Sequence, residues 1–158
     1  MTFDFDRAFA APRVLLAPME DVSDAVFRRL CRDRGADLCV TEFVNVEGLL
    51  RGCKNAKKKL ALAPDDQPTA IQIYGSDPVR LAEAAAVAEA AGPAFVDVNC
   101  GCWVPKIARR GAGAGWLRDP AKMIAMAAQS RRASATAPGA RCRSSISRAG
   151  SRTWACAR

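Results

Sequence analysis

The sequence predicts an α/β protein with a parallel sheet, and three observations support this fold class. Short apolar runs of strand length alternate with stretches suited to helices, in the order strand then helix, between residues 13 and 129. The runs are apolar throughout rather than alternating, which is typical of strands buried on both faces. Polar residues gather where these runs end, and that edge of a parallel sheet is where ligands bind.

Four strands are predicted from apolar and β-branched content. The first, RVLLAP, ends at a proline, and the second, ADLCVTEF, ends in a threonine and a glutamate. The third, TAIQIY, ends at the turn GSDP, and the fourth, AFVDVN, opens into a cysteine-containing loop. In order, these strands are expected at residues 13–18, 36–43, 69–74 and 94–99.

Four helices are expected between and after these strands, at residues 24–34, 46–62, 78–91 and 120–129. Ser23 or Asp21 is the expected cap of the first helix, and Asp119 is the expected cap of the last. Gly35 and Gly92 are placed to end the helices that precede them. The alanine-rich composition of residues 78–91 favours a helix strongly.

The sequence changes character after residue 130. A fifth strand is expected soon after Gln129, but residues 131–158 are dominated by Arg, Ala and Ser and have no apolar periodicity. Seven of the 24 basic residues and no acidic residue lie there, so residues 1–130 hold 17 basic and 16 acidic side chains. The tail therefore contributes +7 of the net charge of +8. We expect a folded part at 1–130 and a disordered or aberrant tail at 131–158, and out-of-frame translation explains the abrupt change best.

Cysteine usage and hydropathy indicate a cytoplasmic protein. The seven cysteines are an odd number without regular spacing, and the sequence has no histidine and no CxxC. Reduced thiols and no metal site are expected. No apolar run reaches the length of a membrane span, and the first residues lack the apolar stretch of a signal peptide.

The loop after the fourth strand, DVNCGCWVPKIARRGAGAG at residues 97–115, holds the most unusual chemistry. Cys100 and Cys102 lack the further ligands of a metal site, and no Gly-Lys-Ser/Thr follows the glycines, which excludes a P-loop. The glycines are expected to permit a tight turn and close packing of the next helix. From the residues alone, Cys102 is equally compatible with a small buried apolar residue and with a reactive thiol.

Four motifs in order resemble the N-terminal half of the tRNA-dihydrouridine synthases over about residues 12–129. They are APM in the first strand, TE at the end of the second, Q-x-x-GSDP after the third, and D-x-N-x-GC after the fourth. The resemblance implies the N-terminal half, about four β/α units, of an FMN-binding TIM (β/α)8 barrel. It also implies that NADPH, through FMN, reduces uridine in tRNA to 5,6-dihydrouridine, in a monomeric cytoplasmic enzyme.

The resemblance assigns roles residue by residue. Cys102 matches the cysteine that protonates the uracil ring, although Trp103 stands where the family usually has proline and Cys100 where Met or Phe is commoner. Free thiols are mostly protonated at neutral pH, so a proton is available. The positions that match flavin contacts are Pro18, Met19, Glu20 and Gln72, with Ala or Gly commoner at the position of Glu20.

Five further residues are expected near the substrate, each with an alternative role. Asn99 and Glu42 are expected to shape the uracil or flavin site, or else to make local turn or capping contacts. The basic residues after the cysteine are expected to meet tRNA phosphates, or else to be solvated loop charges. These basic residues are Lys106, Arg109 and Arg110.

The family's flavin-binding lysine and histidine, its phosphate-binding loops and its helical RNA-docking domain have no counterpart in this sequence. We therefore expect an inactive fragment. Its strand edges and the apolar inner face of the half barrel are expected to be exposed, which favours aggregation. Two alternatives are a non-catalytic RNA-binding fragment that uses its basic tail, and another FMN-dependent barrel oxidoreductase such as an ene-reductase or a dihydroorotate dehydrogenase. The D-x-N-x-GC loop and the basic cluster after it argue against the latter.

Overall fold

The computed structural model describes residues 13–136 and 145–147 and confirms an α/β fold with a parallel sheet. The strand order is β1-β2-β4-β5-β6, with β3 paired to β4, and every pairing is parallel. The strands are β1 (Leu15–Leu16), β2 (Leu38–Val40), β3 (Val44–Asn45), β4 (Thr69–Tyr74), β5 (Val96–Asn99) and β6 (Ser145–Ser147). β1, β2, β4 and β5 fall within the four predicted strands.

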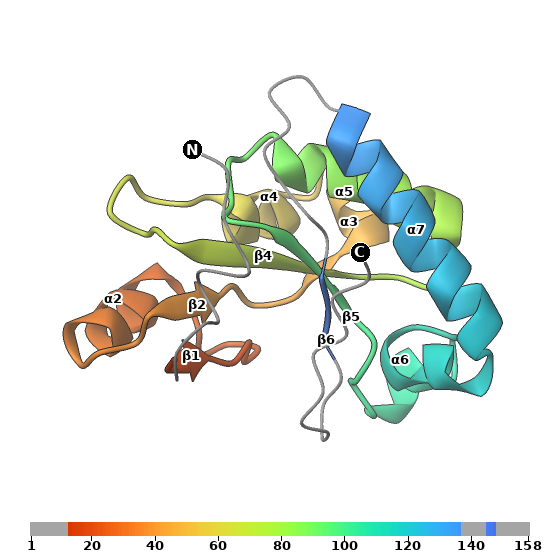
Figure 1. Ribbon diagram of the computed structural model, residues 1–158, viewed down its shortest axis with the longest axis horizontal. Coiled ribbons are helices and arrows are strands. Elements are labelled where there is room, and N and C mark those ends of the chain that lie inside the picture. The colour runs from red at the N-terminus through yellow and green to blue at the C-terminus, as the bar shows by residue number, and fades with distance from the viewer. Residues whose placement is uncertain (1–12, 137–144, 148–158) are drawn as a thin grey trace.

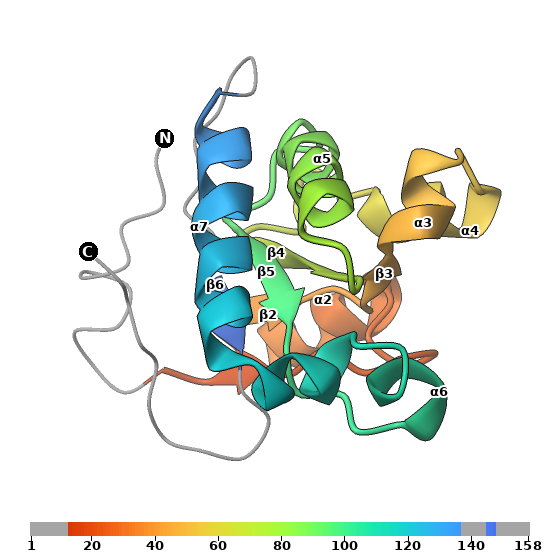
Figure 2. The same ribbon diagram turned by 90° about the vertical axis from the view of Figure 1, so that its right-hand side faces the viewer.

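Helices follow the strands as expected, and α5 and α7 lie side by side over one face of the sheet (Figures 1 and 2). No helix among the described residues is both long enough and apolar enough to span a bilayer. The helices are α2 (Ala25–Asp33), α3 (Val46–Leu50), α4 (Lys54–Leu60), α5 (Pro78–Glu89), α6 (Pro105–Ala108), the 3₁₀ helix η1 (Gly113–Arg118) and α7 (Pro120–Thr136).

The helix starts confirm one of the two expected N-caps and correct the other. Asp24, not Ser23 or Asp21, caps α2, because its side chain accepts a 2.9 Å hydrogen bond from the backbone N–H of Phe27. Asp119 caps α7 as predicted, accepting from the N–H of Lys122 at 2.9 Å.

Residues 46–62 form two short helices instead of one. Gly52 lies between them with φ of 76°, a left-handed conformation that interrupts the first helix. The two-residue strand β3 precedes them, and the helices α6 and η1 occupy the predicted loop after β5. These three elements are too short to show a hydrophobic periodicity, so the sequence pattern did not predict them.

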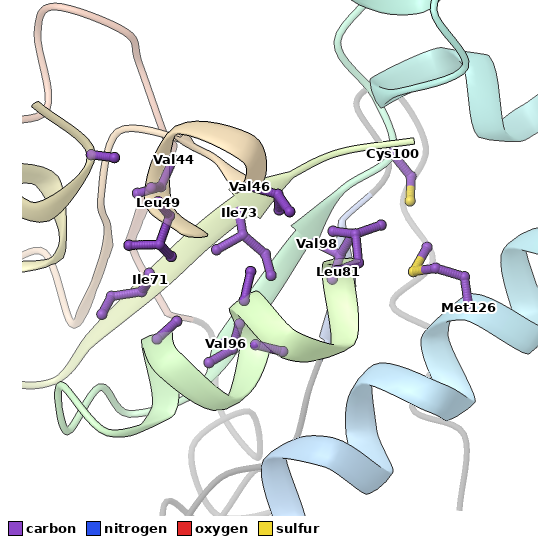
Figure 3. Packing of buried hydrophobic residues seen from close by; sticks show 14 of the residues in the cluster. Val44, Val46, Leu49, Ile71, Ile73, Leu81, Val96, Val98, Cys100 and Met126 are labelled. Atoms are coloured by element: carbon purple, nitrogen blue, oxygen red, sulfur yellow. The ribbon is translucent and has the colours of Figure 1, made fainter. Parts of the chain in front are cut away.

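The main apolar core lies between the sheet and the helices that cover it. Ile71 and Ile73 of β4 pair in register with Val96 and Val98 of β5, so these four side chains share one face of the sheet. They pack with Leu81 of α5 in one buried cluster (Figure 3).

The opposite face of the sheet changes from apolar to polar along the strands. Ala70 and Phe95 belong to a second, smaller cluster of buried apolar residues. Towards the carboxyl ends, Gln72 pairs in register with Asp97, which places both side chains on this opposite face. Gln72 and Asp97 therefore lie towards the edge of the sheet where ligands bind in parallel α/β folds.

The chain after Gln129 differs in part from the expectation. α7 continues to Thr136, and Ser145–Ser147 form β6 parallel to β5. The alternation of strands and helices called for a fifth strand after Gln129, but no apolar run marked its place, and the tail was expected to be disordered or aberrant. β6 joins the sheet through backbone pairing, which composition does not reveal. Residues 137–144 and 148–158 lie outside the described residues, so the division at residue 130 stays a prediction.

Candidate functional site

Three side chains form a hydrogen-bonded row across the carboxyl ends of β4 and β5. Gln72, only 1% exposed, donates from Nε2 to Oδ2 of Asp97 at 2.6 Å. The Oε1 atom of Gln72 accepts from Nδ2 of Asn99 at 3.0 Å. Because a carboxylate only accepts, Asp97 fixes which end of the Gln72 amide faces it, and Asn99 meets the carbonyl end. Two residues expected in the site, Gln72 and Asn99, are thus in direct contact.

The same row continues into the cysteine loop. Oδ1 of Asn99 accepts hydrogen bonds from the backbone N–H groups of Gly101 at 3.1 Å and Cys102 at 2.9 Å, an Asx turn. The carbonyl of Cys102 accepts from the N–H of Ala114 at 2.9 Å, which ties the loop to η1. Cys102 is held half-buried between these two contacts. Asn99 therefore has the local turn role expected as its alternative, and this role serves the cysteine loop.

The two cysteines of the loop have different environments. Cys100 is fully buried and belongs to the core cluster, where its side chain points towards Met126 of α7 (Figure 3). Cys102 is partly exposed instead. Within the part of the chain that the structure describes, no group of three or more His, Cys, Asp or Glu residues is arranged to hold a metal ion.

Glycines let the 3₁₀ helix η1, which the sequence did not predict, pack directly on the cysteine loop. Gly113 has φ of 54°, and a Cβ atom there would lie 2.6 Å from the carbonyl oxygen of Cys102. A Cβ atom on Gly115 would lie 2.6 Å from the carbonyl oxygen of Ala108. Both distances are too short for a real contact, so only glycine permits this packing.

We expect Gly113→Ala to destabilise the protein by about 1–3 kcal/mol and to displace the cysteine loop, because the new methyl group meets backbone atoms that cannot rotate away. Urea unfolding checks the stability, and the iodoacetamide alkylation rate of Cys102, read by mass spectrometry, checks the loop. Gly111→Ala is the matched control, since Gly111 also has positive φ (83°) but its nearest neighbour would be 3.6 Å away. Equal alkylation of Cys102 in both variants would contradict the prediction.

The turn after β1 is held by a reciprocal pair of hydrogen bonds. Ser23, which is fully buried, accepts from the N–H of Met19 at 2.9 Å and donates to the Met19 carbonyl at 3.0 Å. The side chain of Met19 remains 37% exposed, and Pro18 beside it is half-buried. The turn thus presents an apolar side chain on a fixed backbone at the same edge of the sheet.

An ion cluster joins two of the expected site residues through a lysine that the sequence did not single out for the site. Lys59 of α4 contacts Glu20, and its Nζ lies 3.9 Å from Oε1 of Glu42. Oε1 of Glu42 also accepts from the N–H of Asp21 at 2.6 Å. The left-handed backbone of Asp21, with φ of 58°, directs that N–H towards Glu42. Glu20 and Glu42 thus share Lys59 as a common partner.

A buried ion-pair network contacts the turn after β1. Arg28 of α2 and Asp66 are both buried and form a bidentate pair, with the Arg28 Nε atom 3.1 Å from each carboxylate oxygen. Arg32 adds a 2.6 Å contact to Asp66. Burial alone would raise the pKa of Asp66, but hydrogen bonds from Arg28 and Arg32 outweigh it and lower the pKa below its usual range. Arg28 also donates to the carbonyl of Ser23 at 2.7 Å, which connects the network to the Met19 turn.

The basic residues of the loop are exposed. Lys106 lies in α6, and Arg109 and Arg110 follow it. None of the three forms an ion pair with any residue the structure describes. Their charges are available to an anionic partner.

Some of the residues expected in the site lie together, and others that contact them were not assigned to it. The structure brings Gln72, Asn99 and the Cys102 backbone into one chain of hydrogen bonds, and it places Pro18 and Met19 on a neighbouring turn. Asp97 and Lys59 were not expected to contact site residues. An acid inside the otherwise apolar run AFVDVN was the available signal for Asp97, because an isolated buried carboxylate needs a partner.

Comparison with known proteins identifies relatives of this chain. The family model described as dihydrouridine synthase (Dus) matches residues 15–146. The tRNA-dihydrouridine synthase B of Pseudomonas aeruginosa is 39% identical over 109 residues, which cover 69% of this chain and 33% of that protein. A probable tRNA-dihydrouridine synthase of Aquifex aeolicus is 40% identical over 117 residues, covering 73% of this chain and 36% of that protein.

A third relative, the tRNA-dihydrouridine(16) synthase of Salmonella typhimurium, is 41% identical over 128 residues, covering 77% of this chain and 41% of that protein. The chain thus spans about a third of the length of the curated relatives it matches, with 33% and 36% for the first two.

Proposed function

Because the chain belongs to the dihydrouridine synthase family, we propose that it carries part of a site that reduces uridine in tRNA to 5,6-dihydrouridine, with FMN as cofactor and NADPH as reductant. The observation that carries this proposal is the row from Gln72 through Asn99 to the backbone of Cys102. Through these hydrogen bonds, a position that matches a flavin contact of the family is connected to the position that matches its proton donor. We place this activity in the cytoplasm, in a protein that acts as a monomer.

Cys102 is the general acid in this proposal. Reduction of the uracil double bond needs a hydride at one carbon and a proton at the other, and a protonated thiol supplies the proton. The Asx turn of Asn99 and the Ala114 contact fix the backbone of Cys102 while its side chain stays half-buried. A uracil base extruded from its stack can then meet the thiol at the edge of the sheet.

The residues present fit a flavin ring in their chemistry. Gln72 and Asn99 supply amide groups, which match the donors and acceptors of the pyrimidine part of the ring. Pro18 and Met19 supply apolar contact at the same edge, on a turn fixed by Ser23. FMN, when bound, supplies the hydride chemistry. Asp97 contributes by orienting the Gln72 amide through its 2.6 Å hydrogen bond.

Glu20 and Glu42 fit this picture less directly. Both contact Lys59, so we assign them to holding the Met19 turn beside α4, with Glu42 at the border of the substrate site. Lys106, Arg109 and Arg110 are assigned to tRNA phosphates, because they are exposed and unpaired among the described residues. Such contacts position the RNA without reading its sequence.

We expect the purified chain, supplied with FMN, NADPH and unmodified tRNA, to form no dihydrouridine. The aligned part covers only 33% of the Pseudomonas aeruginosa protein, and the family resemblance implies that the remaining flavin contacts lie outside that part. A second experiment replaces the aligned part of the Pseudomonas aeruginosa protein with the corresponding residues of this chain; we call this chimera the graft. The graft is expected to form dihydrouridine, detected by mass spectrometry of tRNA nucleosides.

Two outcomes would change this proposal. A graft that folds and binds FMN but leaves tRNA unreduced argues against the proposed function. Dihydrouridine formed by the chain alone, and lost in Cys102→Ala, disproves the expected inactivity while supporting the acid. The unmodified relative is the positive control for the tRNA and for the assay.

A further inference from the structure

Trp103 is exposed, and its ring does not contribute to the packing of the described residues. It is 78% exposed, the highest value among the large hydrophobic residues described. Trp116 shows how this fold treats a structural tryptophan, since it is 3% exposed and its Nε1 donates to the carbonyl of Gly75 at 2.9 Å. Lys122 also lies 5.6 Å from the centre of the Trp116 ring. Trp103 has no such contact with the residues that the structure describes.

The backbone on both sides of Trp103 is fixed. Before it, the N–H of Cys102 donates to Asn99 and the carbonyl of Cys102 accepts from Ala114, both at 2.9 Å. After it, the carbonyl of Val104 accepts from the N–H groups of Ile107 and Ala108 in α6, at 2.8 and 2.9 Å. An aromatic side chain on an ordered backbone loses little conformational entropy when it binds a partner. The fold therefore presents the Trp103 ring outward from a rigid support.

Uncompensated positive charge surrounds this ring along the chain. Residues 99–118 contain Lys106, Arg109, Arg110 and Arg118 and no acidic residue. The helix α6 lies beyond the carboxyl end of β5 (Figure 1), and we call residues 103–110, with their three exposed cations, the basic lobe at the site edge. An exposed aromatic ring among free cations is the combination that binds single-stranded nucleic acid, with stacking on bases and ion pairs to phosphates.

We propose that Trp103 stacks on an unpaired base of the RNA, next to the uridine whose base reaches Cys102. This inference rests on the proposed function and adds the contact to the neighbouring nucleotide. Extruding one base removes a stacking partner from its neighbour, which costs free energy. The face of Trp103, one residue from Cys102, replaces that partner. The basic side chains of the lobe hold the phosphates on either side.

Stacking and phosphate pairing can be separated by salt dependence. The full 158-residue chain is titrated against a fluorescein-labelled oligouridine over a range of salt concentrations. Trp103→Leu, which removes the π face but keeps an apolar side chain, is expected to weaken binding by about five-fold to 100-fold at every salt concentration. The slope of log K against log salt is expected to stay unchanged, because the variant keeps every cation that pairs with a phosphate. Trp103→Phe is expected to recover most of the affinity.

Two control variants isolate the effect. Replacing Lys106, Arg109 and Arg110 with glutamine is expected to flatten the salt slope by about 0.7 for each phosphate that no longer pairs with a cation. Val104→Ala, at a neighbouring residue that is 43% exposed, is expected to leave binding unchanged. Thermal unfolding of each variant checks that the fold is retained.

The inference is overturned if Trp103→Leu binds oligouridine as tightly as the wild type, or if the wild-type chain does not bind it. Neither result requires turnover, so the outcome is independent of the graft experiment. Weaker binding by Trp103→Leu together with an inactive graft leaves RNA binding and removes the reductase proposal. An active graft together with unchanged oligouridine binding by Trp103→Leu supports the reductase proposal and overturns the stacking role of Trp103.

Discussion

Replacing Asp66 with asparagine is expected to lower the free energy of unfolding by about 3–5 kcal/mol, a large part of the stability of a small domain. The Arg28 and Asp66 side chains are only 4% and 3% exposed, so the substitution leaves a buried guanidinium without its counter-charge. Arg32 and Thr69 lose a partner at the same carboxylate. Because Arg28 also holds the Ser23 carbonyl, the turn that presents Met19 is expected to loosen as well.

The neighbouring Asp65 provides a matched control. It pairs with Arg29 of the same helix as Arg28 at 2.7 Å, but the Asp65 and Arg29 side chains are 60% and 64% exposed. Asp65→Asn is expected to cost no more than about 1 kcal/mol, because solvent screens an exposed pair. Urea unfolding followed by circular dichroism compares the two variants. Equal losses of stability would show that the buried network contributes no more than a surface pair.

The pH dependence of stability gives a second measurement on Asp66. Its pKa is lowered in the folded protein, because hydrogen bonds from Arg28 and Arg32 outweigh the opposing effect of burial. The resulting stabilisation is present above the unfolded-state pKa of about 3.9 and is lost as the pH falls through the lower, folded-state value. The wild type is therefore expected to lose stability more steeply than Asp66→Asn below about pH 4.

The fold was predictable from the sequence because its main strands and helices carry long patterns. The strand β4 lies at the predicted residues 69–74, and α5 begins at Pro78 after its aspartate cap as turn chemistry requires. The short elements α6 and η1 were not predictable, since their packing depends on the close approach of Gly113 to Cys102. A close approach of that kind is set by tertiary packing rather than by periodicity.

The candidate site was predictable in its positions but not in its connections. The motifs placed Gln72, Asn99 and Cys102 at the ends of two neighbouring strands. The structure adds the order of hydrogen bonds, and it shows that Asn99 acts on the backbone of the cysteine loop. Glu20 and Glu42 were expected beside flavin and substrate, and their joint contact with Lys59 could not be read from positions far apart in the chain.

Replacing Cys102 with alanine in the graft is expected to reduce dihydrouridine formation by about 100-fold to 10,000-fold, the usual contribution of a positioned general acid. The backbone hydrogen bonds of Cys102 to Asn99 and Ala114 do not use the side chain, so the loop is expected to keep its conformation in the variant. The loss of activity is therefore expected in the chemical step rather than in folding. Cys53→Ala is the matched control, because Cys53 is an exposed thiol that precedes α4, away from this loop.

The most direct test of the account is the dihydrouridine content of tRNA after reaction with the graft and with its Cys102→Ala and Cys53→Ala variants. Mass spectrometry of the digested nucleosides measures the product, and FMN absorbance confirms equal cofactor loading. We predict product from the graft and from Cys53→Ala, with at least about 100-fold less from Cys102→Ala. Equal product from Cys102→Ala and the graft would contradict the assignment of Cys102 as the proton donor.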